Sequence, residues 1–157
     1  MSSITNIIAA GLGGQGVLKV TDILADVIFC AGLDVKKSEV HGMSQRGGSV
    51  SSEVRFGENV ASPMVPAGEG DILVVLDISQ LEVARPVLKK DGILITPEDV
   101  PTDKLSSPKA LNVMLLGALS AKLPQFSEEL FLAALKKAFP EKLHEANEAM
   151  FKLGRAQ

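Results

Sequence analysis

The sequence predicts an α/β fold, an open and mainly parallel sheet with helices on both faces and a helical C-terminal third. Up to residue 96, short runs rich in β-branched residues alternate with Gly-punctuated turns and helical stretches. Strand–helix–strand order implies right-handed crossovers and therefore parallel strands. From residue 107 onward the patterns are helical. The 157 residues are about one domain's worth, so we expect one domain over 1–157, with a sheet part (1–96) and a helical part (107–154).

The first strand and the first helix follow each other directly. Residues 4–10 (ITNIIAA) form a short apolar run that Gly11 ends, which predicts a buried strand. Over residues 17–31 apolar side chains recur every three or four positions and form one stripe along a helix. Gly32 then stands where a glycine cap ends a helix.

The remaining strands differ in polarity. Residues 33–39 (LDVKKSE) predict a strand near an edge, because the run carries two lysines. Residues 49–56 alternate apolar and polar, which is typical of a strand with one wet face. Residues 72–76 (ILVVL) are apolar on both faces and predict a central strand. A short helix over 81–88, interrupted by Pro86, precedes another expected buried strand at 92–96.

The helical part begins with a clear start signal. Ser107 supplies a capping hydroxyl, and Pro108 fits the first turn of a helix. The stretch that follows, ALNVMLLGALSAKL, is apolar nearly all round. Such a helix is buried on most sides, either within this domain or against another subunit.

Two further helices are expected after it. Ser127, Glu128 and Glu129 begin the first, because acidic residues in the first turn suit the helix dipole. Its apolar face carries Phe131, Leu135 and Phe139. The last helix starts from Pro140, stops at Gly154 and carries the stripe Leu143, Ala146, Met150 and Leu153.

Composition excludes several classes of function. The net charge of −3 gives no electrostatic reason to expect nucleic acid or an anionic membrane as partner. The aromatic residues are six Phe, so base-stacking platforms are not expected. No apolar run approaches the ~20 residues that span a bilayer, and the N-terminus does not resemble a signal peptide. The sequence therefore predicts a cytoplasmic protein.

Metal, cluster and nucleophile sites are also disfavoured. Cys30 is the single cysteine, so it cannot form an intrachain disulfide, and about four thiolates are needed for an iron–sulfur cluster. Its place in the helix predicts a buried, inert thiol. The two histidines, His41 and His144, belong to no set of zinc ligands. We expect no metal site and no catalytic residue in this chain.

A glycine-rich turn links the first strand to the first helix. Its residues are Gly11, Gly13, Gly14, Gln15 and Gly16. In this Rossmann-like context a glycine turn brings backbone N–H groups and a helix N-terminus close to a phosphate. The ribose-binding acid of a dinucleotide site is not in its usual place, because the second strand ends in KKSE. The alternative is a tight turn that binds nothing or contacts another chain.

A second loop concentrates polar groups at the carboxyl end of a predicted strand, where ligands bind in open parallel sheets. The candidate residues in this loop are His41, Ser44, Gln45, Arg46, Gly47 and Gly48. Arg46 could hold a carboxylate or phosphate with two hydrogen bonds. Its structural alternative is to satisfy loop carbonyls or to pair with a partner subunit. Further along, Asp77 follows the central strand and could bind a ligand or cap the next helix.

These segments together resemble a known family. The stretches GLGGQGVLKVTDILADV and SEVHGMSQRGGSV, followed by SPMVPAGEGDILVVLDISQLEVARPVLKKDGILI and SPKALNVMLLGALSAKL, are similar to the γ subunit or domain of the 2-oxoacid:ferredoxin oxidoreductases. The resemblance is greatest to the small β subunit of indolepyruvate:ferredoxin oxidoreductase, and SQRGG is its most specific motif. Family members run longer than this chain between Thr96 and Lys109 and include another strand there.

The resemblance implies a subunit without cofactors of its own. Enzymes of this family oxidatively decarboxylate a 2-oxoacid with thiamine diphosphate and pass electrons through iron–sulfur clusters to ferredoxin. CoA is the co-substrate, and the product is an acyl-CoA. Thiamine diphosphate, Mg and the clusters are expected in a large partner subunit. The glycine turn and the SQRGG loop would then face the partner's active-site region, near the CoA.

Three functions remain open from the sequence. The first is a subunit of an oxidoreductase for indolepyruvate or another arylpyruvate, and pyruvate, 2-oxoglutarate or a branched-chain oxoacid remains open as the alternative substrate. The second is a stand-alone nucleotide- or CoA-binding module that uses the glycine turn. The third is a dimerisation domain that self-associates through residues 111–123.

Overall fold

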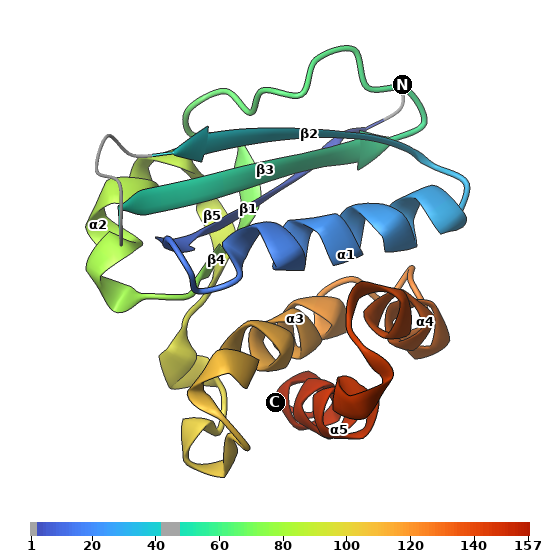
Figure 1. Cartoon of the computed structure of the whole chain (residues 1–157). Helices are drawn as coiled ribbons and strands as arrows, with labels where there is room; N and C mark the ends of the chain where they lie inside the picture. The colour runs from blue at the N-terminus through green and yellow to red at the C-terminus, as the bar shows by residue number, and fades with distance from the viewer. Residues whose placement is uncertain (1–2, 42–47) are drawn as a thin grey trace.

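The computed structural model describes residues 3–41 and 48–157, and its secondary structure follows the expected order (Figure 1). Up to residue 95 the chain contains all five strands and the helices α1 and α2, with three strands in succession after α1, and three helices then complete the chain. The elements are β1 (Thr5–Leu12), α1 (Val17–Cys30), β2 (Asp34–His41), β3 (Ser49–Gly57), β4 (Gly70–Val75), α2 (Leu81–Ala84), β5 (Leu88–Ile95), α3 (Leu111–Ala121), α4 (Glu128–Ala138) and α5 (His144–Arg155).

The sheet is open, with strand order β2-β3-β1-β4-β5. β1 pairs in parallel with β4, and β4 with β5. β3 is antiparallel to both of its neighbours, β1 and β2. Since two antiparallel pairings restore the direction, β2 points the same way as β1, β4 and β5. The open, mainly parallel α/β sheet is therefore confirmed, with β3 as the one reversed strand.

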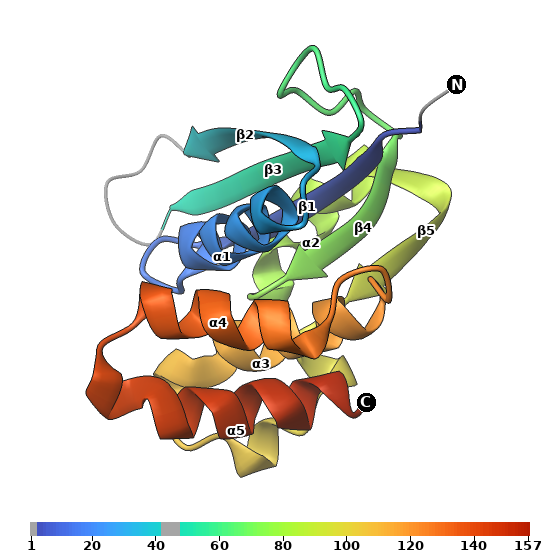
Figure 2. The same ribbon diagram turned by 90° about the vertical axis from the view of Figure 1, so that its right-hand side faces the viewer.

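Helices cover the two faces of the sheet unequally (Figure 2). On the first face α1 packs against the strands, and α3, α4 and α5 complete one large apolar core with it. On the second face a small cluster around Ile8, Leu73 and Val75 is covered by α2 and the 3₁₀ turn that follows it. Helices on both faces and a helical C-terminal third agree with the prediction.

The strand expected at 92–96 is not buried as predicted. β5 begins earlier, at Leu88, and lies at the edge of the sheet with β4 as its one neighbour. Along β5, Ile95 is buried, whereas Ile93 is 39% exposed. The apolar run GILIT carried no information about edge position. The described segment that follows, 96–110, forms short 3₁₀ turns and no further strand.

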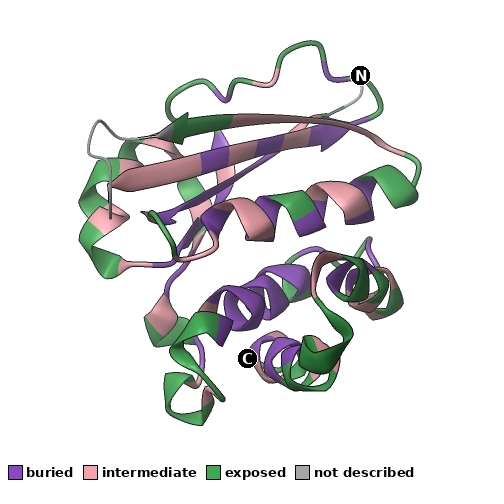
Figure 3. Ribbon diagram, viewed as in Figure 1, coloured by how far each residue is buried: buried purple, intermediate pink, exposed green. Residues whose placement is uncertain are grey.

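The apolar helix α3 is buried within this chain (Figure 3). Its residues 112–120 are all buried, and it packs closely against α5. The prediction of a helix buried on most sides is confirmed, in the form of a core helix of the same domain. Self-association through residues 111–123 is contradicted, because that surface is already covered by the protein itself.

The last helix differs from its expected pattern. Ala146 is exposed and Leu143 is 39% exposed, whereas Asn147, Met150, Phe151 and Gly154 are buried. Gly154 does not stop the helix, which continues to Arg155. The stripe was misplaced because the face of α5 that packs is defined by a glycine and an asparagine, which a pattern of apolar residues overlooks.

Two glycines allow α3 and α5 to touch through their backbones. A Cβ atom at Gly154 would overlap the carbonyl oxygen of Met114, and one at Gly117 would overlap that of Phe151. No side chain larger than hydrogen fits at either position without separating the helices. The two glycines thereby fix how closely α5 packs on α3.

Polar contacts hold the same helix pair in register. Ser120 Oγ donates to the carbonyl of Gly117 at 2.6 Å and accepts from Arg155 Nη1 at 2.8 Å. Arg155 Nε also pairs with Glu128 Oε2 at 3.3 Å, at the start of α4. These contacts tie the end of α5 to both other helices of the C-terminal part.

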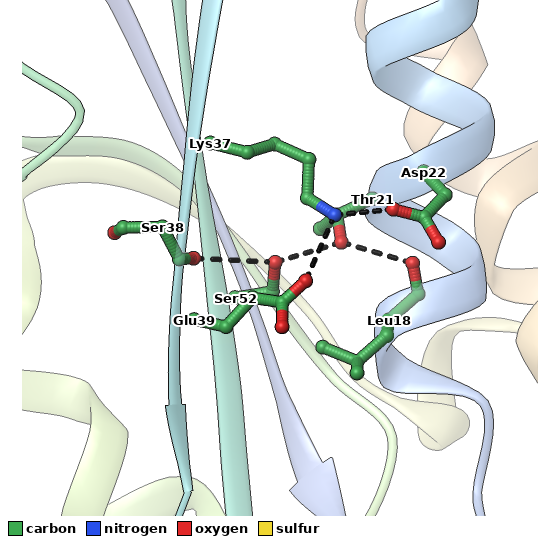
Figure 4. A network of polar contacts seen from close by, with 7 residues as sticks. All are labelled: Leu18, Thr21, Asp22, Lys37, Ser38, Glu39 and Ser52. Atoms are coloured by element: carbon green, nitrogen blue, oxygen red, sulfur yellow. Dashed lines mark hydrogen bonds and ion pairs between the residues drawn. The ribbon is translucent and has the colours of Figure 1, made fainter.

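A second polar network fastens α1 to the sheet (Figure 4). The buried hydroxyls of Thr21 and Ser52 lie 2.7 Å apart, between the helix and β3. Beside them Lys37 of β2 pairs with Asp22 of α1 and with Glu39 at 3.2 Å. Burial acts to lower the pKa of Lys37, but these two carboxylates outweigh it and raise that pKa.

Cys30 is exposed, which corrects the prediction of a buried thiol. It is the last residue of α1 and lies off the stripe that Val27 and Ile28 bury. Its neighbour Phe29 is 72% exposed on the same turn. The apolar character of both residues suggested burial, but the helix phase at its C-terminus turns them outward.

None of the helices within the described ranges has the length and apolar character needed to cross a membrane.

Gly154→Ala tests the crossing of α3 and α5. In an ordinary helix interior this change stabilises by about 0.5–1 kcal/mol. Here we expect a loss of about 1–3 kcal/mol in the free energy of unfolding, because the new methyl group overlaps the α3 backbone. Urea denaturation measures it. Ala149→Leu, on the exposed side of α5, should change stability by about 0.5 kcal/mol or less. A Gly154→Ala protein as stable as wild type would contradict the crossing.

Candidate functional site

The glycine turn lies where the sequence predicted, between the carboxyl end of β1 and the start of α1. Gly14 and Gly16 have φ angles of 87° and 84°, in the left-handed region that glycine adopts without strain. Gly16 is the N-cap of α1 and supplies no side-chain cap. The first backbone N–H groups of α1 are therefore available to an anionic ligand.

Gln15 holds the turn in this shape. Its Oε1 accepts from the backbone N–H of Leu12 at 2.7 Å, and its Nε2 donates to Asp77 Oδ2 at 2.8 Å. Gly11 lies so close that a Cβ there would be 2.8 Å from the same Oε1. The glycines and Gln15 of the motif thus act as one unit.

Asp77 is a capping residue, which decides between its two predicted roles. Its Oδ1 accepts from Ser79 Oγ at 2.7 Å and from Ser79 N at 3.1 Å, at the start of the 3₁₀ turn η1 (Ile78–Gln80). The Ser79 hydroxyl, the Ser79 N–H and the Gln15 amide lower the pKa of Asp77. The carboxylate is thereby kept charged while it holds Gln15 in place.

The helical part of the chain completes a cleft beside the turn. The cleft has a volume of about 510 Å³ and is lined by the turn, by Leu76 and by residues at the start of α3. Asn112 is 6% exposed, and its side-chain nitrogen packs directly against Gly16. Its Oδ1 accepts from the N–H of Val113 at 2.9 Å. Lys109 also lines the cleft and brings a positive charge.

Lys109 and Asn112 were not among the predicted site residues. They lie far from the glycine motif in sequence and are brought to it by the packing of α3. A signal was present in the sequence, since an asparagine inside a helix that is otherwise apolar must satisfy its amide somewhere.

The second predicted loop adjoins the first at one point. The N–H of Gly13 donates to the carbonyl of Gly48 at 2.9 Å. Leu12 pairs with Ser49, and the backbone of His41 pairs with Val50. The two ends of the loop therefore lie at the same end of the sheet as the carboxyl end of β1. Ser44, Gln45, Arg46 and Gly47 lie outside the described residues, as does the side chain of His41.

The described part of the cleft is suited to binding. Helix N–H groups and the Lys109 ammonium favour an anionic group such as a phosphate or carboxylate. Lys109 is the one ionisable side chain among its described lining residues. Within residues 3–41 and 48–157, no three His, Cys, Asp or Glu side chains gather as metal ligands. His144 is structural, because its Nε2 lies 2.9 Å from the carbonyl of Lys136 and 2.8 Å from that of Phe139 at the end of α4.

Comparison with known proteins identifies relatives over nearly the whole chain. The family model described as pyruvate ferredoxin/flavodoxin oxidoreductase matches residues 6–157. The indolepyruvate oxidoreductase subunit IorB of Thermococcus kodakarensis is 34% identical, over 95% of this chain and 93% of that protein. The IorB proteins of three other archaea are matched over 45 to 61% of their own length.

Solved structures share the fold. The γ subunit of a keto/oxoacid ferredoxin oxidoreductase from Geobacter sulfurreducens superposes with a TM-score of 0.80 at 24% identity, over 96% of this chain and 95% of that one. A 2-oxoglutarate:ferredoxin oxidoreductase from Magnetococcus marinus superposes with a TM-score of 0.77 at 20% identity. This match covers 98% of the present chain and 30% of the longer one.

Gly16→Ala and Gly14→Ala form a matched pair that tests the cleft. Both positions have positive φ, so either alanine should lose about 1–2 kcal/mol to backbone strain. A Cβ at Gly14 meets open space, whereas one at Gly16 overlaps the Asn112 amide. We expect Gly16→Ala to lose about 1–2 kcal/mol more in chemical denaturation. Adding Asn112→Ala should cancel that excess, and equal losses in the two single variants would contradict the packing.

Asp77→Asn tests the anchor of the turn through pH. Since the folded-state pKa of Asp77 is lowered, its contribution is fully present above the unfolded value of 3.8 and is lost as pH falls through the folded value. We expect the wild-type protein to exceed Asp77→Asn by about 1 kcal/mol near neutral pH. The difference should shrink below pH ~4, as measured by urea unfolding across pH. A difference independent of pH would count against the carboxylate's role.

Proposed function

The chain belongs to the pyruvate ferredoxin/flavodoxin oxidoreductase family, and on that basis we propose what this subunit contributes to catalysis. Family membership makes it a subunit of a 2-oxoacid:ferredoxin oxidoreductase. We propose that the complete enzyme oxidatively decarboxylates indolepyruvate or another arylpyruvate, reduces ferredoxin and releases an acyl-CoA. The match over residues 6–157 carries this proposal, and the IorB relative supports the choice of substrate.

Within the complex this chain supplies shape and binding groups. The thiamine diphosphate, Mg and iron–sulfur clusters of the proposed enzyme belong to a large partner subunit, where they supply decarboxylation and electron transfer. Two observations support this division. Lys109 is the one ionisable side chain among the described residues that line the cleft, and the chain has a single cysteine. The exposed thiol of Cys30 also suits the reducing cytoplasm that we propose as the location.

The glycine turn is the proposed contact with CoA. The N-terminus of α1 and Lys109 present positive potential at one end of the cleft, and Gly48, at the end of the SQRGG loop, is hydrogen-bonded to Gly13. Arg46 from that loop would add a guanidinium for a phosphate group. Together these groups would hold an anionic part of CoA, while the thiol end extends toward the partner's active site.

The same cleft keeps one alternative open. A stand-alone nucleotide- or CoA-binding module would use the same backbone N–H groups and Lys109 without a partner. Calorimetric binding of a nucleotide to the isolated chain favours this module. Activity that requires a second subunit favours the oxidoreductase.

Reconstitution tests the proposed function. The isolated chain should show no 2-oxoacid-dependent reduction of ferredoxin. Mixed with its candidate large subunit, it should form a stable complex that reduces ferredoxin when an arylpyruvate and CoA are present. Turnover by either chain alone, or failure of the two chains to associate, would contradict the proposal. Comparison of indolepyruvate, pyruvate, 2-oxoglutarate and a branched-chain oxoacid identifies the preferred substrate.

Arg46→Ala tests the contact with CoA in the assembled enzyme. Loss of a charge-assisted hydrogen bond to phosphate should raise the KM for CoA about 10- to 100-fold, with a smaller effect on the KM for the 2-oxoacid. Lys142→Ala, at an exposed cation between α4 and α5, is the control and should leave both constants unchanged. An unaltered KM for CoA in Arg46→Ala would remove Arg46 from the site.

A further inference from the structure

The second face of the sheet carries an apolar groove that the glycine turn does not use. Its volume is about 400 Å³. Ile8 and Ala10 of β1 line it, together with Val83 of α2 and Val87 of the 3₁₀ turn that follows α2. Val65, from the segment between β3 and β4, also lines it. The volume and the predominantly aliphatic lining are those of a binding site.

Large apolar side chains are exposed at the rim of this groove. Val40 at the end of β2 is 59% exposed, and Val83 of α2 is 69% exposed. On the first face, α1 and the three C-terminal helices bury the corresponding side chains of the sheet (Figure 3). Apolar residues gathered and exposed at a groove mark a surface that another molecule covers.

A carboxylate gives this groove a polar preference. Glu53 of β3 lines it, half-buried, and its Oε1 accepts from Val65 N at 3.1 Å and from Ser38 Oγ at 3.3 Å. Within the described residues Glu53 forms no ion pair. Arg55, two positions along the strand, instead binds Asn6 Oδ1 and the carbonyls of 62 and 64. The charge of Glu53 is therefore available to a cation brought by the occupant.

The groove is also connected to the candidate cleft. Ser49 Oγ, at its lining, donates to Gln80 Oε1 at 2.6 Å, and Gln80 N donates to the carbonyl of Asp77 at 2.9 Å. Asp77 in turn holds Gln15 of the glycine turn. A molecule seated in the groove would thus lie beside the edge of the sheet where we place CoA.

From these features we propose that the groove receives a segment of the large partner subunit, with aliphatic side chains against Val40 and Val83 and a lysine or arginine against Glu53. The inference rests on the proposed function and specifies the docking face. A protein segment suits the groove better than a free small molecule, because the same fold makes up 30% of a longer chain in the Magnetococcus marinus structure. This fold thus occurs joined to further protein within one chain.

Binding of the large subunit to groove variants tests this proposal. Val83→Asp and Val40→Asp each place a negative charge, at an exposed position, in the groove that Glu53 also lines. Each should raise the Kd for the large chain at least about ten-fold, measured by interferometry. Phe29→Asp is the matched control, because Phe29 is 72% exposed on α1, away from the groove, and its Kd should stay unchanged. Circular dichroism verifies that each variant is folded.

Glu53→Gln isolates the charge. The amide oxygen can still accept from Val65, so the groove keeps its shape while the negative charge is removed. We expect the Kd to rise about 3- to 10-fold and to depend less steeply on salt than that of the wild type.

The outcomes separate the two proposals. If the wild-type chain binds the large subunit and the groove variants bind equally well, the groove inference is overturned and the proposed function stands. If the wild-type chain does not bind at all, both fall. If the isolated chain forms a dimer that Val83→Asp converts to a monomer, the occupant is a second copy of this chain and the inference is overturned.

Discussion

The backbone contact between α3 and α5 at Gly117 and Gly154 is the constraint on which the site depends. It sets how closely α5 packs on α3, and the N-terminal end of α3 carries Asn112 beside Gly16. The cleft therefore depends on two contacts of α3, one with α5 and one with the glycine turn. A protein interior is close-packed and transmits displacements. A methyl group at Gly154 would therefore displace α3 and, with it, Asn112 at the glycine turn.

The side chains of the cleft are suited to binding a ligand and not to reacting with it. Its described side chains offer hydrogen-bond donors, one ammonium and a tight glycine turn, without a nucleophile or a general base. Asp77 is the carboxylate nearest in the network, and it serves to hold Gln15 and to cap η1. In the function we propose, such a site would orient an anionic co-substrate and leave the reaction to groups held in the partner subunit.

The two faces of the sheet have different roles. The first is sealed by α1 and the C-terminal helices, and its buried residues stabilise the domain. The second bears a small cluster and an open groove with Glu53 at its side. Because β1 lies between β3 and β4, its carboxyl end contributes to both the groove and the glycine turn. A partner docked in the proposed groove would therefore lie close to the proposed CoA site at the carboxyl end of β1.

The sequence by itself determined most elements, since local patterns of apolar residues, the Ser107 and Ser127 caps and the glycine motif act over a few residues. It also determined the family, through SQRGG and the turn. Only the tertiary structure decided the edge position of β5, the exposure of Cys30, the packing face of α5 and the presence of Lys109 and Asn112 at the cleft. Each of these depends on contacts between segments distant in sequence, whose free energy no local pattern records.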